Sequence, residues 1–181
     1  PGAKVHPTVQ VGPYAVIEDG AVIGDGCELR AHAVVRRHTT LGRGNVVHEG
    51  AVLGGEPQDL AFAGGESGVV IGDRNRIREG VTIHRSTMAG GVTTVGSDCF
   101  LMAYVHVAHD DKIGDGVIIA NNVALAGHVE LGERAFLSGG VVVHQFCRVG
   151  RLAMIGGNSK VVQDCLPFVI TDGVPARACG L

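Results

Sequence analysis

Four of the nine histidines gather near the middle of this 181-residue chain, and imidazole is the side chain best suited to move protons near neutral pH. They are His106, His109, His128 and His144. Asp110 directly follows His109, where a carboxylate can hold the ring in one tautomer and stabilise its protonated form. Gly127 precedes His128, and its backbone N–H can stabilise an oxyanion. No Ser or Cys in the setting of a nucleophile accompanies them, so general-base activation of a substrate hydroxyl is favoured over a covalent enzyme intermediate.

These side chains can act together only if the fold brings them side by side, and the sequence contains a repeat that does so. Val, Ile or Leu recurs every six residues at 24 positions, from 5 through 53, 71 through 83 and 95 through 161. A small or β-branched residue usually stands four positions after each. Neither the 3.6-residue period of a helix nor the two-residue period of a strand explains this spacing, whereas a short strand followed by a turn does.

The six-residue period predicts an all-β chain folded as a parallel β-helix, with three repeats in each triangular coil and about eight coils in total. Two Gly-rich polar segments, 54–70 and 84–94, interrupt the repeat and are expected to form excursion loops, where substrate contacts tend to concentrate. We expect a β-helix domain over residues 1–166 and an irregular tail over residues 167–181. The repeat alone does not predict the handedness of the coils.

Three six-residue repeats make one coil of 18 residues, so residues that are 18 apart should stack on each other along the predicted β-helix. Val107, Leu125 and Val143 are 18 residues apart, so they should stack on the same side of three successive coils. His109, His128 and His144 follow them by two, three and one residues, which places the three rings on one strip about 10 Å long. The histidines of the first coils are interpreted as surface residues: His6, His32, His38 and His48.

Composition excludes several classes of partner. The net charge is −3, only 18% of residues are charged, and no basic run would follow a nucleic acid backbone. No stretch approaches the roughly 20 apolar residues of an integral membrane segment. The five cysteines are odd in number and form no CxxC motif, which is typical of buried, reduced thiols in a cytoplasmic protein.

Several longer motifs are more specific than the repeat itself: IGDRNRIREGVTIHRST, HVAHD, NNVALAGHVELG, HQFCRVG and the loop GGEPQDL. Over essentially the whole chain the sequence resembles the UDP-N-acetylglucosamine acyltransferases of lipid A biosynthesis, within the hexapeptide-repeat superfamily. The resemblance implies left-handed coils and a homotrimer with sites between subunits. It also implies transfer of an (R)-3-hydroxyacyl group from acyl carrier protein to the glucosamine 3-hydroxyl of UDP-N-acetylglucosamine. The donor would be the phosphopantetheine thioester of the carrier protein, with no metal and no other cofactor.

The same resemblance assigns roles to individual residues. His109 would be the general base, Asp110 would orient it, and Gly127 would supply the oxyanion N–H. Substrate-binding roles would fall to Gln58, Asp59, His84, His106, His128, His144 and Gln145. Met154 and Gly157 would line the groove for the acyl chain, although the chain length that it accepts does not follow from the sequence. Members of the family continue after the position of Leu181 into a helical C-terminal domain that contacts the nucleotide, and the sequence has no counterpart of it.

Three alternatives stay open at the level of sequence. The N-acyltransferase of the same pathway shares the repeat, but it carries an extra N-terminal domain for which there is no room before Val5. A zinc hydratase similar to γ-class carbonic anhydrases would use three histidines from neighbouring subunits, and the HxxH spacing of His106 and His109 fits it poorly. A truncated or decayed β-helix could instead act as a non-catalytic scaffold or bind a sugar nucleotide without turnover.

Overall fold

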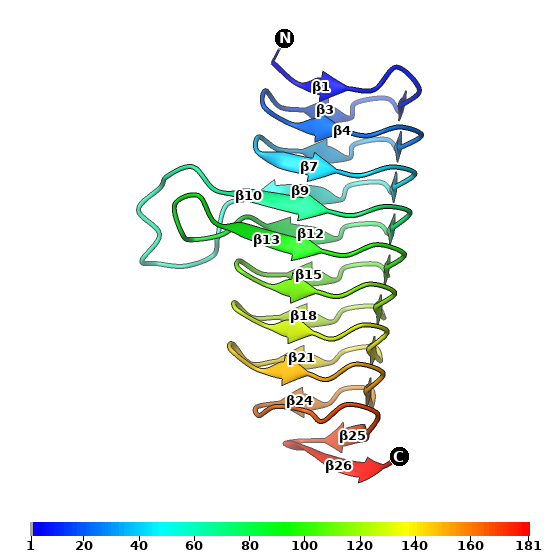
Figure 1. Cartoon of the computed structure of the whole chain (residues 1–181), viewed down its shortest axis with the longest axis vertical. Coiled ribbons are helices and arrows are strands. Elements are labelled where there is room, and N and C mark those ends of the chain that lie inside the picture. The colour runs from blue at the N-terminus through cyan, green and yellow to red at the C-terminus, as the bar shows by residue number, and fades with distance from the viewer. Residues whose placement is uncertain (1) are drawn as a thin grey trace.

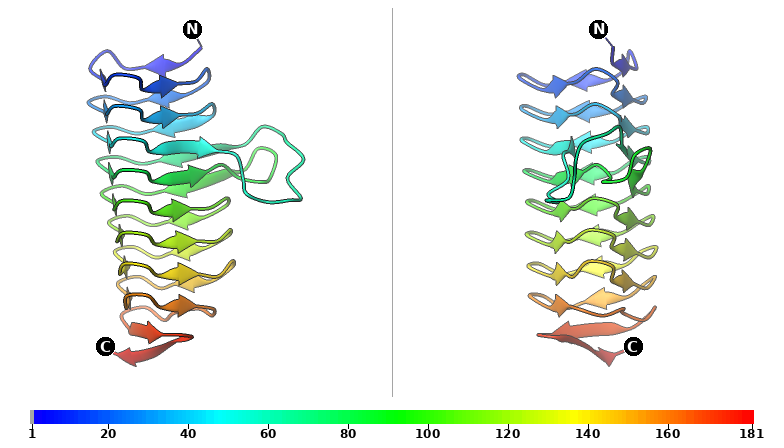
Figure 2. Two further views of the ribbon diagram at one scale, coloured as in Figure 1. Left: turned by 180° about the vertical axis from the view of Figure 1, so that it is seen from behind. Right: turned by 90° about the vertical axis from the view of Figure 1, so that its left-hand side faces the viewer.

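The chain forms a column of stacked triangular coils (Figure 1). A computed structural model describes residues 2–181, in which three sheets run along the length of the column (Figure 2). From β1 to β24, strands that follow one another in the chain belong to different sheets, and each strand pairs in parallel with strands of the neighbouring coils. The left-handed parallel β-helix predicted for this chain is confirmed.

Each sheet takes every third strand of the helix, and we call the three sheets A, B and C. Sheet A contains β1 (Lys4–Val5), β4 (Val22–Ile23), β7 (Thr39–Leu41), β10 (Gly68–Ile71), β13 (Val92–Val95), β16 (Lys112–Ile113), β19 (Glu130–Leu131) and β22 (Arg148–Val149). Sheet B contains β2 (Gln10–Val11), β5 (Glu28–Leu29), β8 (Val46–Val47), β11 (Arg76–Ile77), β14 (Phe100–Leu101), β17 (Ile118–Ile119), β20 (Phe136–Leu137), β23 (Met154–Ile155), β25 (Ile170–Gly173) and β26 (Ala176–Gly180). Sheet C contains β3 (Val16–Ile17), β6 (Val34–Val35), β9 (Val52–Gly55), β12 (Thr82–His84), β15 (His106–Val107), β18 (Ala124–Leu125), β21 (Val142–Val143) and β24 (Lys160–Val161).

The repeated aliphatic residues form the core. Each of the 24 repeat positions lies in one of the strands β1 to β24, and from Ile23 to Val161 every one of them is buried. The small residues that stand two positions before them fill the corners of the coil, as Ala21, Ala33 and Ala51 do without any exposed surface. Only at the open first coil are the repeat residues exposed, with Val5 at 40% and Val11 at 52%.

Two loops leave the column at the edge between sheets C and A (Figure 2). Residues 56–67 connect β9 to β10, and residues 85–91 connect β12 to β13. Both excursions were predicted, but the predicted segments 54–70 and 84–94 are too long at both ends. Their outer residues belong to β9, β10, β12 and β13, because the chain keeps pairing with neighbouring coils before it leaves the wall, as Val69 does with Thr39 and Thr93.

The C-terminal tail is ordered, contrary to the prediction that residues 167–181 are irregular. β25 pairs in parallel with β23, and β26 returns antiparallel to β25. Thr171 and Ala176 take buried positions, at 4% and 2% exposed, over the last coil. An open sheet end presents unpaired N–H and C=O groups, and this hairpin covers those of β23 at the end of sheet B without the six-residue period.

Residues 2–181 contain no helix that is long and apolar enough to cross a bilayer.

Candidate active site

The coil repeat stacks the candidate residues in two columns at the corner between sheets C and A. His109, Gly127 and Gln145 occupy one position on three successive coils, 18 residues apart. Asp110, His128 and Phe146 occupy the next position. The backbones are linked there: His128 N–H donates to the carbonyl of His109, and Phe146 N–H to that of Gly127, both over 3.1 Å. Of the three histidines predicted to share one strip, the structure brings His109 and His128 into contact, whereas His144 is exposed and has no ring contact with either of them among the described residues.

His109 and Asp110 form a hydrogen-bonded pair. The Nδ1 atom of His109 lies 2.9 Å from Oδ2 of Asp110, and the imidazole side chain is 12% exposed. Because a carboxylate can only accept, Nδ1 carries the hydrogen and Nε2 is left with its lone pair. None of residues 2–181 occupies Nε2 with a hydrogen bond. This is the tautomer of a general base.

Asp110 is held in place by donors from the short loop 85–91. Its side chain is only 3% exposed. The Ser86 hydroxyl donates to Oδ1, while the backbone N–H and hydroxyl of Thr87 donate to Oδ2 over 3.1 and 2.7 Å. Burial by itself raises the pKa of Asp110, but the hydrogen bonds from Ser86, Thr87 and His109 outweigh it and bring the pKa to about 2. The carboxylate is therefore ionised throughout the neutral range.

Gly127 lies directly against the His109 ring. A Cβ atom at this glycine would meet Cε1 of His109 at 2.3 Å and Nε2 at 2.6 Å, so no larger residue fits without moving the ring. Within the part of the chain that the structure describes, nothing accepts a hydrogen bond from the Gly127 N–H. A free backbone donor thus stands beside the basic nitrogen of His109.

His128 is fixed between two rings. Its imidazole stacks on Phe146, with centroids 4.7 Å apart and planes at 12°, and it meets His109 edge-on at 5.3 Å. Its Nε2 lies 3.8 Å from Oδ2 of Asp110. His144 is exposed at the end of β21, where its Nδ1 lies 3.1 Å from the carbonyl oxygen of Gln145.

A groove of about 400 Å³ runs along this face. Its polar lining is Gln58, His106, His109, Gly127 and Gln145, and its apolar floor comes from β18 and β21. The Nδ1 atom of His106 lies 2.7 Å from the hydroxyl of Thr82, and burial lowers the pKa of His106. Burial therefore favours the neutral form of the His106 ring.

His84 lies behind His106 rather than in the groove. The two rings meet edge-on at 4.7 Å, and His84 is 9% exposed. Burial, followed by the neighbouring charges of His106 and His109, lowers the pKa of His84 to about 4. Its buried Nδ1 has no hydrogen-bond partner among the described residues.

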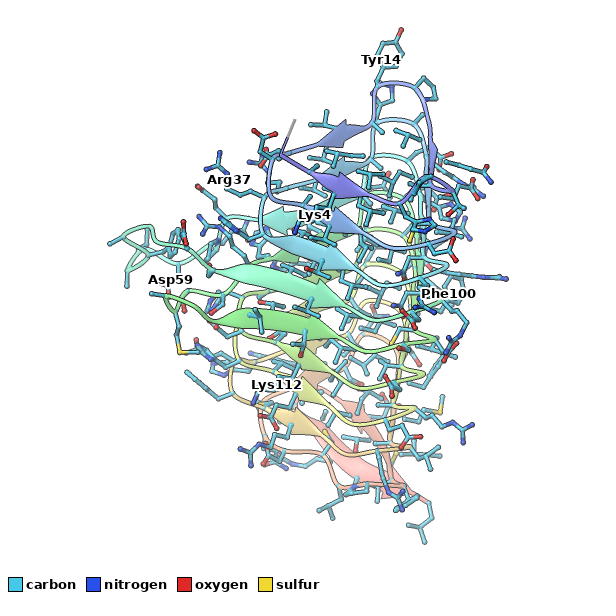
Figure 3. All side chains as sticks on the ribbon, turned by 45° about the horizontal axis from the view of Figure 1, so that its top comes forward. Lys4, Tyr14, Arg37, Asp59, Phe100 and Lys112 are labelled. Carbon is cyan, nitrogen blue, oxygen red and sulfur yellow. The ribbon has the colours of Figure 1, made fainter. Side chains whose placement is uncertain are left out.

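Three of the sequence-predicted site residues lie away from the groove within a single chain. Asp59 is exposed on the 56–67 loop, well outside the column (Figure 3), and its carboxylate accepts the N–H of Ala61 over 2.8 Å. Met154 and Gly157 lie on β23 of sheet B and in the turn that follows it. None of these three residues is among those that line the groove.

The prediction that His48 is a surface residue is wrong. It is 9% exposed, since residues from the coils on either side cover it: its Nδ1 lies 3.1 Å from Nη1 of Arg30 and 3.5 Å from Oε1 of Glu79. Burial and the charges of Arg30 and Arg78 lower its pKa. His6, His32 and His38 are exposed as predicted.

Sequence reasoning missed Ser86 and Thr87, which donate to Asp110, and Phe146, which stacks on His128. The first two lie in a segment recognised only as an interruption of the repeat. Phe146 carried a usable signal, because it stands 18 residues after His128 and 36 after Asp110.

Comparison with known proteins gives consistent relatives. A family described as bacterial transferase hexapeptide (six repeats) matches residues 2–37 and 93–127. The chain is 53% identical to the acyl-acyl-carrier-protein–UDP-N-acetylglucosamine O-acyltransferase of a Synechocystis species, over 79% of this chain and 52% of that protein. It is 46% identical to the enzyme of the same name from Agrobacterium fabrum, over 99% of this chain and 71% of that protein.

Solved structures agree with these relatives. LpxA from Acinetobacter baumannii superimposes with a TM-score of 0.98 at 39% identity, covering 100% of this chain and 70% of that one. The chain spans about half the length of the relatives from Synechocystis and Gloeothece citriformis. It aligns along nearly its whole length with the relative from Agrobacterium fabrum, and therefore belongs to the UDP-N-acetylglucosamine O-acyltransferase family.

Proposed function

We propose that the protein transfers an (R)-3-hydroxyacyl group from acyl carrier protein to the 3-hydroxyl of the glucosamine in UDP-N-acetylglucosamine, the first step of lipid A biosynthesis. The observation that carries the proposal is the hydrogen-bonded pair of His109 and Asp110 next to the free N–H of Gly127, on the wall of a groove. Family membership supports the choice of substrates, because relatives at 46 to 53% identity carry this activity in their names.

In the proposed reaction Nε2 of His109 takes the proton of the sugar 3-hydroxyl as its oxygen attacks the thioester carbonyl. The ionised carboxylate of Asp110 stabilises the imidazolium that forms. The negative charge that develops on the carbonyl oxygen is stabilised by the N–H of Gly127. Collapse of the tetrahedral intermediate breaks the carbon–sulfur bond, and His109 returns the proton to the departing thiolate. The phosphopantetheine of the carrier protein supplies this thiol, and no metal takes part in the scheme.

We place the sugar nucleotide along the polar lining of the groove, with Gln58, His106 and Gln145 as its nearest side chains. His128 and His144 would contact it from the turns next to this lining. His84 would act from behind His106, by packing against it. Asp59, Met154 and Gly157 would reach the substrates from a neighbouring subunit, with the last two bordering the acyl chain.

A homotrimer and a cytoplasmic location belong to the same proposal. The trimer is supported by the distribution of the predicted site residues over two faces of one chain. The cytoplasmic location is supported by five free cysteines, four of which are buried, since thiols remain reduced there.

The proposal is tested by measuring acyl transfer from (R)-3-hydroxyacyl carrier proteins to UDP-N-acetylglucosamine. We expect His109→Ala to lose at least about 100-fold in kcat, the scale of a general-base contribution, while its circular dichroism spectrum and melting temperature stay near those of the wild type. Unchanged turnover in His109→Ala would refute the catalytic assignment. A wild-type protein that binds UDP-N-acetylglucosamine without turnover would support the scaffold or sugar-nucleotide-binding alternative.

One observation keeps a metal-dependent alternative in view. His109, Asp110 and His128 each offer a ligand atom within 4.8 Å of the others, which is close enough to hold one ion. For metal-free acyl transfer, dialysis against EDTA should leave kcat within about twofold of its starting value. Stoichiometric zinc in the purified protein, together with loss of activity on its removal and recovery on its return, would contradict the proposed mechanism.

A further inference from the structure

Arg85 is the residue around which the long loop 56–67 folds. Although charged, it is only 8% exposed. Its Nη1 donates to the carbonyl of Gly65 over 2.6 Å and to the hydroxyl of Ser67 over 3.2 Å. Its guanidinium lies 5.0 Å from the ring centre of Phe62, and its Nη2 lies 3.5 Å from a carboxylate oxygen of Glu56. One side chain thus contacts the loop near its start, its middle and its end.

Ser86, the next residue, faces the opposite way. It has no exposed surface, and its hydroxyl donates to Oδ1 of Asp110. Its carbonyl accepts the hydroxyl of Ser67 over 2.5 Å, and its Oγ accepts the N–H of Met88 over 3.0 Å. Ser86 therefore joins three parts of the molecule, which are the long loop, the short loop and the carboxylate that faces His109.

Arg85 and Ser86 together connect loop 56–67, which borders the groove, to the pair of His109 and Asp110. Gln58, on the loop that Arg85 holds, lines the groove, and Asp110, which Ser86 holds, contacts His109 on the same groove. We propose that Ser86 is a positioning residue that orients the Asp110 carboxylate toward His109, and that Arg85 is a positioning residue that holds the substrate-contacting loop. This inference rests on the proposed acyl transfer for its kinetic consequences.

The proposal predicts that the two residues act on different properties of the site. Oδ1 of Asp110 has Ser86 as its hydrogen-bond donor, whereas Oδ2 has Thr87 and His109. Without Ser86 the carboxylate loses the donor that fixes Oδ1, so Oδ2 is held less firmly against His109 and stabilises a protonated His109 less. The titratable groups that face it are His109, His128 at 3.8 Å and the adjacent Asp111. Loss of Arg85 removes no contact of these groups, but it removes the contacts that hold loop 56–67.

The test compares Ser86→Ala with Ser159→Ala. Ser159 is a matched control, because it is also fully buried and also donates to an aspartate, Asp172, over 2.9 Å, but it lies in the last coil. In ¹⁵N NMR titrations of the histidine rings, with the His109 signal identified by its loss in His109→Ala, we expect Ser86→Ala to move the His109 titration to lower pH by about half a unit. Ser159→Ala should leave that titration in place. Equal midpoints in Ser86→Ala and wild type would overturn the role of Ser86, whether or not the protein turns over.

Kinetics then separate the two residues. Ser86→Ala should lower kcat about tenfold, the usual effect of removing one hydrogen bond to a buried charge, and Ser86→Thr, which keeps the hydroxyl, should recover most of it.

Arg85→Met should raise KM for UDP-N-acetylglucosamine about tenfold while the His109 titration stays at its wild-type position. A shifted titration in Arg85→Met, or an unchanged KM together with an unchanged rate of proteolysis in loop 56–67, would contradict the role given to Arg85. Failure of acyl transfer in the wild type would refute the proposed function alone, since the titration and proteolysis still decide the inference.

Discussion

The contact between Gly127 and the His109 ring sets the geometry of the candidate site. The ring occupies the space that a side chain at position 127 would need, and the N–H of the same glycine lies free beside it. One residue thereby combines two tasks, giving room to the base and supplying a donor for an oxyanion. A backbone donor needs no rotamer to be ordered when charge develops, so it is preorganised.

We therefore expect Gly127→Ala to lower kcat at least about 100-fold, because the new methyl group displaces the imidazole from its place over the glycine. Gly139→Ala is the control: a Cβ there meets its nearest atom, the carbonyl oxygen of Asn121, at an ordinary 3.5 Å. Steady-state kinetics on both variants, with melting temperatures beside them, check the prediction. Comparable losses in the two variants would mean that general destabilisation, and not the displaced ring, lowers the rate.

A few polar side chains are buried in the core, and they lie at the corners of the coils. The position two residues before each repeat aliphatic is usually small or apolar, but Asn45, Asn75 and Asp111 take it with no exposed surface. Asn75 satisfies its neighbours with both halves of its amide, accepting from the N–H of Cys99 and donating to the carbonyl of Gly96. Asp111 can only accept when ionised, from the N–H groups of Val129 and Ala108.

Burial raises the pKa of Asp111 to about 8, even though its two N–H donors favour the ionised form. A folded-state pKa above the usual 3.8 contributes stability that is complete below about pH 4 and is lost as the pH rises toward 8. Asp111→Asn should remove this dependence. Between pH 4.5 and 8 the melting temperature of the wild type is expected to fall by at least about 4 °C relative to that of the variant.

Asn75→Asp is the matched control, because it introduces an aspartate at an equivalent buried position. The variant should lose stability as the pH rises, whereas the wild-type Asn75 does not titrate. Parallel melting curves of wild type and Asp111→Asn across this range would contradict the assignment of the titration to Asp111.

For the whole molecule, the outer face of sheet B points to assembly. Its outward row on neighbouring coils is apolar, consisting of Phe100, Ile118, Phe136 and Met154, and Met154 is 42% exposed. The outward row of sheet A on the corresponding coils is charged, with Lys112, Glu130 and Arg148 in ion pairs (Figure 3 labels Lys112). An apolar row is typical of a surface that is covered in an oligomer, whereas a charged row is typical of a solvated one.

Under the proposed trimer, light scattering should give three times the 18.7 kDa chain mass. Phe136→Glu should reduce it to a single chain mass, because it places a charge in an apolar contact. Lys4→Glu, which introduces the same residue on the exposed outer row of sheet A, should leave the trimer intact. A wild-type protein at the mass of one chain would contradict the trimer, and with it the placement of Met154 and Gly157 at the acyl chain.

The coil and the spacing of the site along it follow from the amino-acid sequence alone. A six-residue aliphatic period fits a short strand followed by a turn, so it predicted all 24 strands of the coil, and the 18-residue coil placed His109 near His128. Adjacent residues such as His109 and Asp110 also needed no tertiary information. These relations follow from a repeat, and a repeat can be read from the chain.

Where the repeat is interrupted, the positions of the side chains depend on tertiary contacts. Ser86 reaches Asp110 from 24 residues away, Arg85 reaches Gly65 from 20, and the hairpin of β25 and β26 closes the last coil outside the period. Loop residues are released from the periodic wall, so their positions depend on side-chain contacts that spacing does not encode. The burial of His48 between Arg30 and Glu79 also depends on tertiary contacts, although His48 lies within the repeat, because side chains of two neighbouring coils cover it.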